Sequence, residues 1–524
     1  MHWQRAAALA ADWLDWSAGV GCFAGAAWLL RPGRLERVER AARRPAAERS
    51  IEWALAAAWP LLLCALKLAQ YQSYQLMGDS AVFANTVYNA AQGRGLVCSL
   101  YGGLHALAFH FQLTALLFAP LARLWSSPAP LVVAHAAALG LCPWLVYKIS
   151  RPAGAAPALG AALLTLANPM YADLAGNFLD CANFAPPFFL AAALLWSRGR
   201  RAAAALAALL LLTTREQAPF VLFGVCAWLA LEARDVRARA AALAGAAGTV
   251  VLWLGEMRLI GSGGEGLAAS QWGMFSRVGG SLTGVLRTLA TRPWALAAAL
   301  VWPPAKLWTA LRVLGAFAFL PLAAGPALLP ALAAWLPQQL ADEHSFFHQM
   351  RGIYGAFVLG PMAWAAARGL CSLAPKRPRG LAAAVLSAAG LGLLQRGFHL
   401  LPAGELPAVW LDEGPAALAS VPGAAAVWTD QFFAAHLAMR PCLKILPPDR
   451  DALFERGLFL PDRVLLSRRG LDFVAPAQRA LLLRILEERR FAPVYRGRDL
   501  WVLANPETFG REGLRPPDGL RLDR

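Results

Sequence analysis

Long apolar runs separated by short, arginine-rich loops make up most of this chain. Runs such as 51–73, 129–147 and 238–259 have close to the roughly 20 residues that a helix needs to cross a bilayer. Inside the hydrocarbon core every backbone N–H and C=O must be hydrogen-bonded within the protein, and a helix bundle achieves this. With 58% hydrophobic and 15% charged residues, the chain has too few polar residues for a soluble protein of this size. We therefore predict a mainly α, polytopic transmembrane helix bundle of about 11–12 spans.

The basic residues predict how the spans are oriented. The net charge is +17, which could suggest a nucleic-acid partner, but the arginines are spread over the loops between apolar runs and form no single binding face. This distribution is typical of cytoplasmic loops in membrane proteins. The clusters are Arg31–Arg49, Lys148–Arg151, Arg198–Arg201, Arg234–Arg239 and Lys376–Arg379. We expect the lipid bilayer, and no nucleic acid, as the partner, with these clusters inside.

The apolar run 104–124 is the ambiguous one, because it contains His105, His110 and Gln112. If this run crossed the membrane, the next two basic clusters would face outward, against the charge rule. We therefore expect 104–124 to lie along the outer surface. An earlier run, 13–30, is expected to be a short span or an interfacial helix, because its acidic residues argue against a signal peptide.

The chain divides into four regions by composition. We expect an N-terminal helix and basic cytoplasmic loop, a transmembrane core with a long outer loop at 260–306 and a proline-broken helix pair at 308–337, an extracytoplasmic α/β domain and a disordered tail. The boundaries are 1–50, 51–399, 400–505 and 506–524. Short β-like runs in the third region predict strands at 425–427, 463–466, 494–495 and 500–503.

Asp79 is the first candidate site residue. It opens a polar stretch, 77–95, directly after the span at 51–73, and it is the single acidic side chain there. An ionisable group at a membrane boundary is a functional-site candidate. The alternative is a helix N-cap, since an Asp before a helix-compatible segment that stops at Gly93 also suits capping.

Three further polar groups fall on the same predicted side of the membrane. Asp180 lies in a polar loop and could equally cap the helix that follows. Arg215 and Glu216 lie between two apolar runs and could neutralise each other, although Arg is also a natural phosphate ligand. His348 and Arg351 are one helical turn apart. We add His110 as a weaker substrate-binding candidate.

Familiar cofactor motifs do not occur in the sequence. There is no P-loop, no dinucleotide-binding glycine pattern, no His-Glu-x-x-His and no Cys-x-x-Cys pair, so none of the corresponding sites is predicted. The cofactor is left open, with a divalent cation (Mg²⁺ or Mn²⁺) held by Asp79 as one alternative.

Several motifs occur in a familiar order. They are Gly78-Asp79 through Phe83 with Asn89 through Leu96, His110-Phe111 leading to Leu117-Phe118-Ala119-Pro120, and Arg215-Glu216-Gln217 before a span. Over residues 51–505 the chain resembles the domain-of-unknown-function 2079 family of bacterial integral membrane proteins, related to the glycosyltransferase C superfamily. It departs from the family pattern at three places, with Leu179-Asp180-Cys181 for Asp-Phe-His, Arg215-Glu216-Gln217 for Lys-Glu-Asp, and His348-Gln349 for His-Tyr.

The resemblance implies an enzyme of the bacterial plasma (inner) membrane. Such enzymes transfer a hexosyl or pentosyl group from a polyprenyl-phosphate donor and use an acidic residue in the first outer loop, which by position is Asp79. It also implies that 104–124 is a juxtamembrane helix. Two alternatives stay open, a transporter or flippase of lipid-linked saccharide and a non-catalytic membrane assembly protein.

The orientation can be tested by labelling. In a cysteine-free background, Arg377→Cys should resist a membrane-impermeant thiol reagent in intact cells and react after permeabilisation, because the charge rule places 376–379 inside. Labelling of this position in intact cells would overturn the topology.

Overall fold

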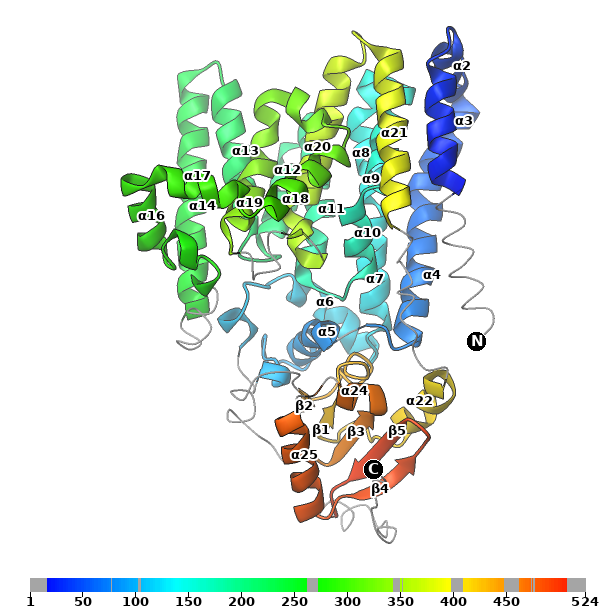
Figure 1. Ribbon diagram of the computed structural model, residues 1–524, viewed down its shortest axis with the longest axis vertical. Coiled ribbons are helices and arrows are strands. Elements are labelled where there is room, and N and C mark those ends of the chain that lie inside the picture. Colours follow the sequence, from blue (N-terminus) through cyan, green and yellow to red (C-terminus); the bar gives the residue numbers. More distant parts are fainter. Residues whose placement is uncertain are drawn as a thin grey trace.

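The computed structural model describes residues 17–76, 78–101, 105–261, 272–342, 349–350, 352–396, 409–446, 461–472, 474 and 476–506. A tall bundle of helices carries a small sheet domain at one end (Figure 1). The predicted mainly α membrane bundle with a small C-terminal α/β domain is therefore confirmed. The predicted disordered tail lies outside the described residues, apart from its first residue.

Apolar helices form the bundle because each satisfies its own backbone hydrogen bonds. Five helical stretches are long and apolar enough to cross a membrane, namely Pro45–Gln72, Ala129–Ala153, Val236–Ile260, Leu320–Leu340 and Gly352–Leu373. Shorter apolar helices are Ser17–Leu29, Ala115–Leu124, Ala155–Leu166, Cys181–Ser197, Arg201–Leu212, Ala218–Glu232 and Pro378–Leu394. The described part of the chain thus traverses the bundle many times.

The individual elements of the bundle are α2 (Arg34–Ala42), α3 (Pro45–Trp53), α4 (Trp59–Gln72), α5 (Gly78–Ala91), η3 (Ala106–Ala108), α6 (Ala115–Leu124), α7 (Ala129–Gly140), α8 (Cys142–Ser150), α9 (Ala155–Leu166), α10 (Pro169–Gly176), η5 (Cys181–Phe184), α11 (Ala185–Ser197), α12 (Arg201–Leu212), α13 (Ala218–Glu232), α14 (Val236–Gly261), α16 (Leu282–Thr291), α17 (Pro293–Val301), α18 (Pro304–Gly315), η7 (Leu320–Leu328), α19 (Leu329–Leu340), η9 (Gly352–Gly355), α20 (Ala356–Leu373) and α21 (Pro378–Arg396).

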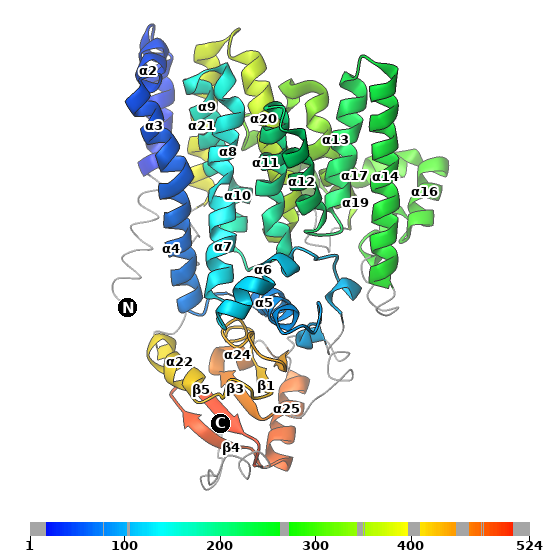
Figure 2. The same ribbon diagram turned by 180° about the vertical axis from the view of Figure 1, so that it is seen from behind.

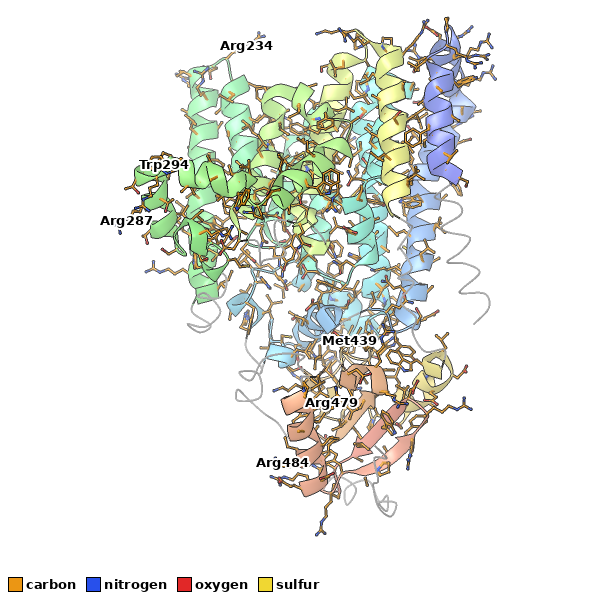
Figure 3. The ribbon with its side chains drawn as sticks, in the orientation of Figure 1. Arg234, Arg287, Trp294, Met439, Arg479 and Arg484 are labelled. Atoms are coloured by element: carbon orange, nitrogen blue, oxygen red, sulfur yellow. The ribbon has the colours of Figure 1, made fainter. Side chains whose placement is uncertain are left out.

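Ion pairs gather three of the basic clusters at one end of the bundle, which we call the basic end. Arg379 pairs with Glu36 at 3.1 Å and Arg151 with Glu48 at 2.7 Å. Lys148 pairs with Glu52. Figure 3 shows Arg234 at this end, whereas Arg479 and Arg484 lie in the sheet domain at the other. We call the other end, where the sheet domain sits, the domain end.

The run 104–124 does not form one helix. Its helical part is α6, whose ten residues span only about 15 Å and cannot cross a bilayer. α6 lies beside α5 at the domain end (Figure 2). Between η3 and α6, residues 109–114 are not helical, and two of their donors bond elsewhere: Phe111 N–H to Glu216 and Thr114 N–H to the Thr213 carbonyl. The placement of 104–124 along the outer surface stays a prediction, and the helix is shorter than the juxtamembrane helix that the resemblance implies.

The proline-rich region after 300 is broken as expected. The span Leu320–Leu340 joins η7 to α19 through a kink at Gly325, where φ is 61° and ψ is −134°, a conformation that glycine tolerates readily. Before it, α16 and α17 project sideways from the bundle beside α14 (Figure 1), and α17 contacts α19. The exposed Trp294 lies on this projection (Figure 3).

A five-stranded sheet forms the centre of the C-terminal domain, in the order β2-β1-β3-β5-β4. β1 pairs in parallel with β2 and β3, whereas β5 is antiparallel to β3 and β4. The elements are α22 (Val409–Ala419), β1 (Val427–Thr429), β2 (Leu443–Ile445), β3 (Arg463–Ser467), α24 (Arg468–Asp472), α25 (Pro476–Glu488), β4 (Ala492–Arg496) and β5 (Leu500–Ala504). Strand β2 was not predicted, and β1 begins two residues later than we expected.

Asn85 connects the sheet domain to α5. Its amide donates to the carbonyls of Ala438 (3.0 Å) and Arg440 (2.9 Å), and its oxygen accepts from Ser99 N–H at 2.9 Å. Figure 3 shows Met439 at the same junction. Because Asn85 is fully buried, these bonds are shielded from water and fix the domain on the helix that begins with Gly78 and Asp79.

Close helix packing generates a stability prediction. A Cβ added at Gly224 in α13 would lie 2.5 Å from the backbone of Pro330 in α19, whereas one at Gly248 in α14 meets nothing within 4 Å. Gly224→Ala should lower the free energy of unfolding by about 1–3 kcal/mol. Gly248→Ala should leave it unchanged or raise it by up to about 1 kcal/mol.

Thermal unfolding of both variants in detergent measures the difference. Equal transition temperatures for the two variants would show that α13 and α19 do not pack this closely.

Candidate functional site

A cavity of about 270 Å³ opens at the domain end of the bundle. Its walls come from the start of α5, the loop before α6, the loop between α10 and α11, the loop between α12 and α13, and η9. The lining residues are Asp79, Val82, Phe83, His110, Gln112, Asn177, Phe178, Asp180, Arg215, Gly352, Ile353 and Tyr354. Four residues proposed from the sequence, Asp79, His110, Asp180 and Arg215, therefore meet in one cavity.

Asp79 is in the first turn of α5, one position after the first helical residue. Among the described residues its carboxylate accepts no side-chain or backbone hydrogen bond, so the structure does not show the capping role that was the alternative. Asp79 has accessible surface and lines the cavity, but protein surrounds its carboxyl closely enough to remove much of its hydration. Burial by the surrounding protein raises the pKa of the Asp79 carboxyl above its ordinary value, and the Asp180 charge raises it further, against the opposing effects of Arg215 and His110.

The sheet domain contacts the helix directly before Asp79. A Cβ at Gly78 would lie 2.7 Å from Ile445 Cδ1, so Ile445 of β2 packs on the first residue of α5. Together with the bonds of Asn85 to the same domain, this contact sets where Asp79 enters the cavity.

Asp180 and Arg215 face each other across the cavity. Arg215 Nη2 lies 3.7 Å from Asp180 Oδ2, and both side chains are at most 10% exposed. The other carboxylate oxygen, Oδ1, accepts the N–H of Ala182 at 2.7 Å and caps η5. Asp180 therefore caps the helix that follows and also lines the cavity, while its role in binding substrate stays a prediction.

The loop that carries Asp180 is anchored from α4. Lys67 donates to the carbonyl of Asn177, and Gln70 donates to that of Gly176 at 2.7 Å. The Leu179 N–H bonds Ser80 Oγ of α5 at 2.9 Å. These bonds hold Asp180 at a fixed place relative to Asp79, because Ser80 is the next residue along α5.

His110 and Glu216 form a second pair behind the cavity wall. Their Nδ1 and Oε1 atoms are 2.9 Å apart, and the side chains are 29% and 7% exposed. The other Glu216 oxygen accepts the Phe111 N–H at 3.1 Å. Burial alone would raise the pKa of Glu216, but His110, with help from Arg215, outweighs it and lowers that pKa to about 2.

Arg215 and Glu216 are adjacent in the chain but have different close partners. The Arg215 charge also helps His110 to lower the pKa of Glu216 against the effect of burial, so part of the mutual neutralisation expected from the sequence is present. Arg215 faces Asp180 in the cavity, and Glu216 faces His110. The turn after α12 thus presents a cation to the cavity while the adjacent carboxylate holds the loop before α6.

Two predicted site residues, His348 and Arg351, lie outside the described residues. Their near neighbour Tyr354 lines the cavity. Sequence reasoning missed the apolar wall formed by Val82 and Phe83. Their spacing of three and four residues from Asp79 puts all three on one face of α5, and this spacing could have revealed them.

The cavity is lined by both acidic and basic side chains, namely Asp79, Asp180, His110 and Arg215. Within the described parts of the chain, no three His, Cys, Asp or Glu side chains gather where they could hold a metal ion. A divalent cation held by Asp79 stays a prediction. The arrangement offers, in the lining of one cavity, a carboxylate that can take up a proton and a guanidinium suited to an anionic oxygen.

A comparison with family models matches residues 71–499 to "Predicted membrane protein (DUF2079)". The chain belongs to this family. The resemblance drawn from the sequence motifs is thereby confirmed, and the protein is a multi-pass membrane protein. No curated protein matches the chain.

Two solved structures are similar to the chain. They are crystal structures of ArnT from Cupriavidus metallidurans, one bound to undecaprenyl phosphate and one in the apo state. The identities are 17% and 16% and the TM-scores 0.43 and 0.42, and each alignment covers 86% of this chain and 98% of the other. Similarity at this level assigns no activity to this chain.

The His110–Glu216 pair predicts a pH-dependent stability. Because the folded pKa of Glu216 is about 2 and an unperturbed Glu titrates near 4.3, its stabilising effect is present above about pH 4.3 and is lost as the pH falls toward 2. Glu216→Gln should cost about 1–3 kcal/mol at neutral pH, and the difference from wild type should shrink below pH 4.

Glu232→Gln is the matched control, since Glu232 pairs with Arg368 at 3.6 Å with both side chains almost half exposed. It should cost less than about 1 kcal/mol. Thermal unfolding between pH 3 and 8 measures both variants, and a pH-independent loss for Glu216→Gln would contradict the ion pair.

Proposed function

We propose that this protein is an integral-membrane glycosyltransferase that moves a sugar from a polyprenyl-phosphate-linked donor to an acceptor at the outer face of the membrane. The observation that carries the proposal is the convergence of Asp79 and Arg215 on one cavity at the end of a membrane bundle. A carboxylate and a guanidinium that line one cavity suit a reaction in which one group loses a proton while another leaves as a phosphate.

The location of the cavity suits a lipid-linked donor. It lies at the domain end, where α5 and α6 cover the bundle (Figure 2), so a lipid tail can stay in the bilayer while its head group enters. The arginine-rich loops gather at the opposite end, and such loops favour the cytoplasm. By this argument the cavity and the C-terminal domain are extracytoplasmic, in a bacterial plasma membrane.

The residues supply both halves of the transfer. The bond between the sugar's anomeric carbon and the phosphate oxygen breaks, and a bond from that carbon to the acceptor oxygen forms. Asp79 accepts the acceptor's proton, and its raised pKa makes it a better base than an ordinary Asp. Arg215 stabilises the charge on the departing polyprenyl phosphate, and Asp180 orients the guanidinium.

His110 and Glu216 have a supporting role in this scheme. Their pair holds the loop before α6 against the turn after α12, which keeps Arg215 facing the cavity. His348 and Arg351 stay proposed substrate-binding residues through their position next to η9. The four regions, 1–50, 51–399, 400–505 and 506–524, are likewise proposed divisions of the chain.

The function predicts the behaviour of an Asp79→Asn variant. Asn keeps the size of the side chain but cannot act as a base, so turnover should fall about 100- to 10,000-fold. The folded state should be at least as stable at neutral pH, because a carboxyl with a raised folded pKa disfavours folding once it ionises.

Asp412→Asn is the matched control, since Asp412 is likewise an acid in the first turn of a helix but lies in the C-terminal domain. The assay is transfer from a panel of labelled polyprenyl-phosphate sugars by purified protein. Near-normal turnover by a well-folded Asp79→Asn protein would refute the catalytic role. Movement of an unchanged lipid-linked saccharide across vesicles, without transfer, would indicate a flippase instead.

A further inference from the structure

A second, much smaller chamber adjoins the cavity. Its volume is about 10 Å³, close to the minimum that one water molecule needs. The lining residues are Arg215, Gln217, Gln338, Ile353, Tyr354 and Phe357. Three of them, Arg215, Ile353 and Tyr354, also line the main cavity, so the two spaces share a wall.

Two residues that line this chamber have a buried amide oxygen with no hydrogen-bond partner in the described part of the chain. These oxygens are Oε1 of Gln217 and Oε1 of Gln338. Gln338 is 4% exposed. Buried acceptors of this kind are rare in folded proteins and usually indicate a water or ligand that completes them.

The hydrogen bonds of the two amide nitrogens determine how each amide group is oriented. Gln217 Nε2 donates to the carboxylate of Glu216 at 3.3 Å, and Gln338 Nε2 donates to the Ala334 carbonyl at 3.3 Å. The ionised Glu216 carboxylate and the Ala334 carbonyl can only accept hydrogen bonds. Flipping either amide would therefore place its oxygen against another acceptor oxygen. The chamber therefore presents two hydrogen-bond acceptors and needs a donor.

The two glutamines that carry the acceptors are attached to packed parts of the helix bundle. Gln338 lies in α19, which packs against α13 at the close contact of Gly224. Gln217 directly precedes α13 and follows Arg215 and Glu216 in the same turn. A ligand group in the chamber would thus be positioned relative to the proposed phosphate-binding Arg215.

We propose that the chamber is a subsite for one hydroxyl or amino substituent of the sugar whose ring occupies the main cavity. The proposal rests on the proposed glycosyl transfer and adds to it a determinant of sugar specificity. The small volume admits a single polar group, and the two acceptors require that this group donate hydrogen bonds. A hydrogen or methyl at the same sugar position would leave both amide oxygens unsatisfied.

The test compares donors that differ at one sugar position, carrying a hydroxyl, an amino group or hydrogen. Wild-type protein should use either the hydroxyl or the amino donor with a kcat/KM roughly 10- to 100-fold above that of the deoxy donor. The donor with the higher kcat/KM identifies the substituent that the chamber binds. Gln338→Leu and Gln217→Leu keep the side-chain volume but remove the acceptor. Each should lower kcat/KM for the preferred donor about tenfold or more and leave the deoxy donor unchanged.

Gln339→Leu is the control, because Gln339 is equally buried on the same helix and also has an unpartnered oxygen but does not line the chamber. It should keep the wild-type preference. A binding readout accompanies the rates: the sugar-bearing donor should raise the thermal transition more than sugar-free polyprenyl phosphate does, and Gln338→Leu should lose this difference. If Gln338→Leu does not fold, Gln338→Met repeats the test.

The outcomes separate the two proposals. A wild-type protein that neither turns over nor is stabilised by any donor of the panel would overturn glycosyl transfer and the subsite with it. A protein that transfers sugar without preference at any position, or whose preference survives in Gln338→Leu, would overturn the subsite alone and indicate a chamber that holds a structural water.

Discussion

Charged side chains that leave water at the edge of a membrane must find partners, and this requirement brings the site together. Asp180 faces Arg215, and Glu216 faces His110. The four residues come from three loops far apart in the chain. A buried charge left alone would cost several kcal/mol, so the loops meet where the charges can pair, and the cavity with Asp79 lies between them.

Much of this could be predicted from the sequence, because hydrophobic length and basic loops act locally. The spans at 51–73 and 129–147 match helical stretches closely, and the charge rule predicts that 104–124 does not cross. Strand β2 could not be found, since Leu443–Ile445 is only three residues long, too short for its apolar-polar-apolar order to indicate a strand, and it forms one only through pairing with β1. The sequence also could not predict which charged residues pair. Arg215 and Glu216 are adjacent and suggest a pair with each other, and only the tertiary structure shows the contacts Arg215–Asp180 and Glu216–His110.

The site also illustrates why stability and function diverge at particular residues. Asp79 makes no compensating bond among the described residues, and its raised pKa means that ionising it opposes folding. The unpartnered oxygens of Gln217 and Gln338 are a similar cost. Proteins commonly tolerate such costs where a ligand completes the arrangement. Glu216 differs, because both of its carboxylate oxygens already have hydrogen-bond partners and it stabilises the fold.

The attachment of the C-terminal domain to α5 has a consequence for biosynthesis. Asn85 bonds Ala438 and Arg440, so α5 depends on residues made more than 350 positions later. During synthesis at about 5–20 residues per second, α5 and Asp79 wait roughly 20 seconds or longer for these partners. A nascent chain truncated before residue 438 would contain the membrane helices but lack these bonds to α5, so the helix that carries Asp79 is fully supported only after the last domain has been made and has docked.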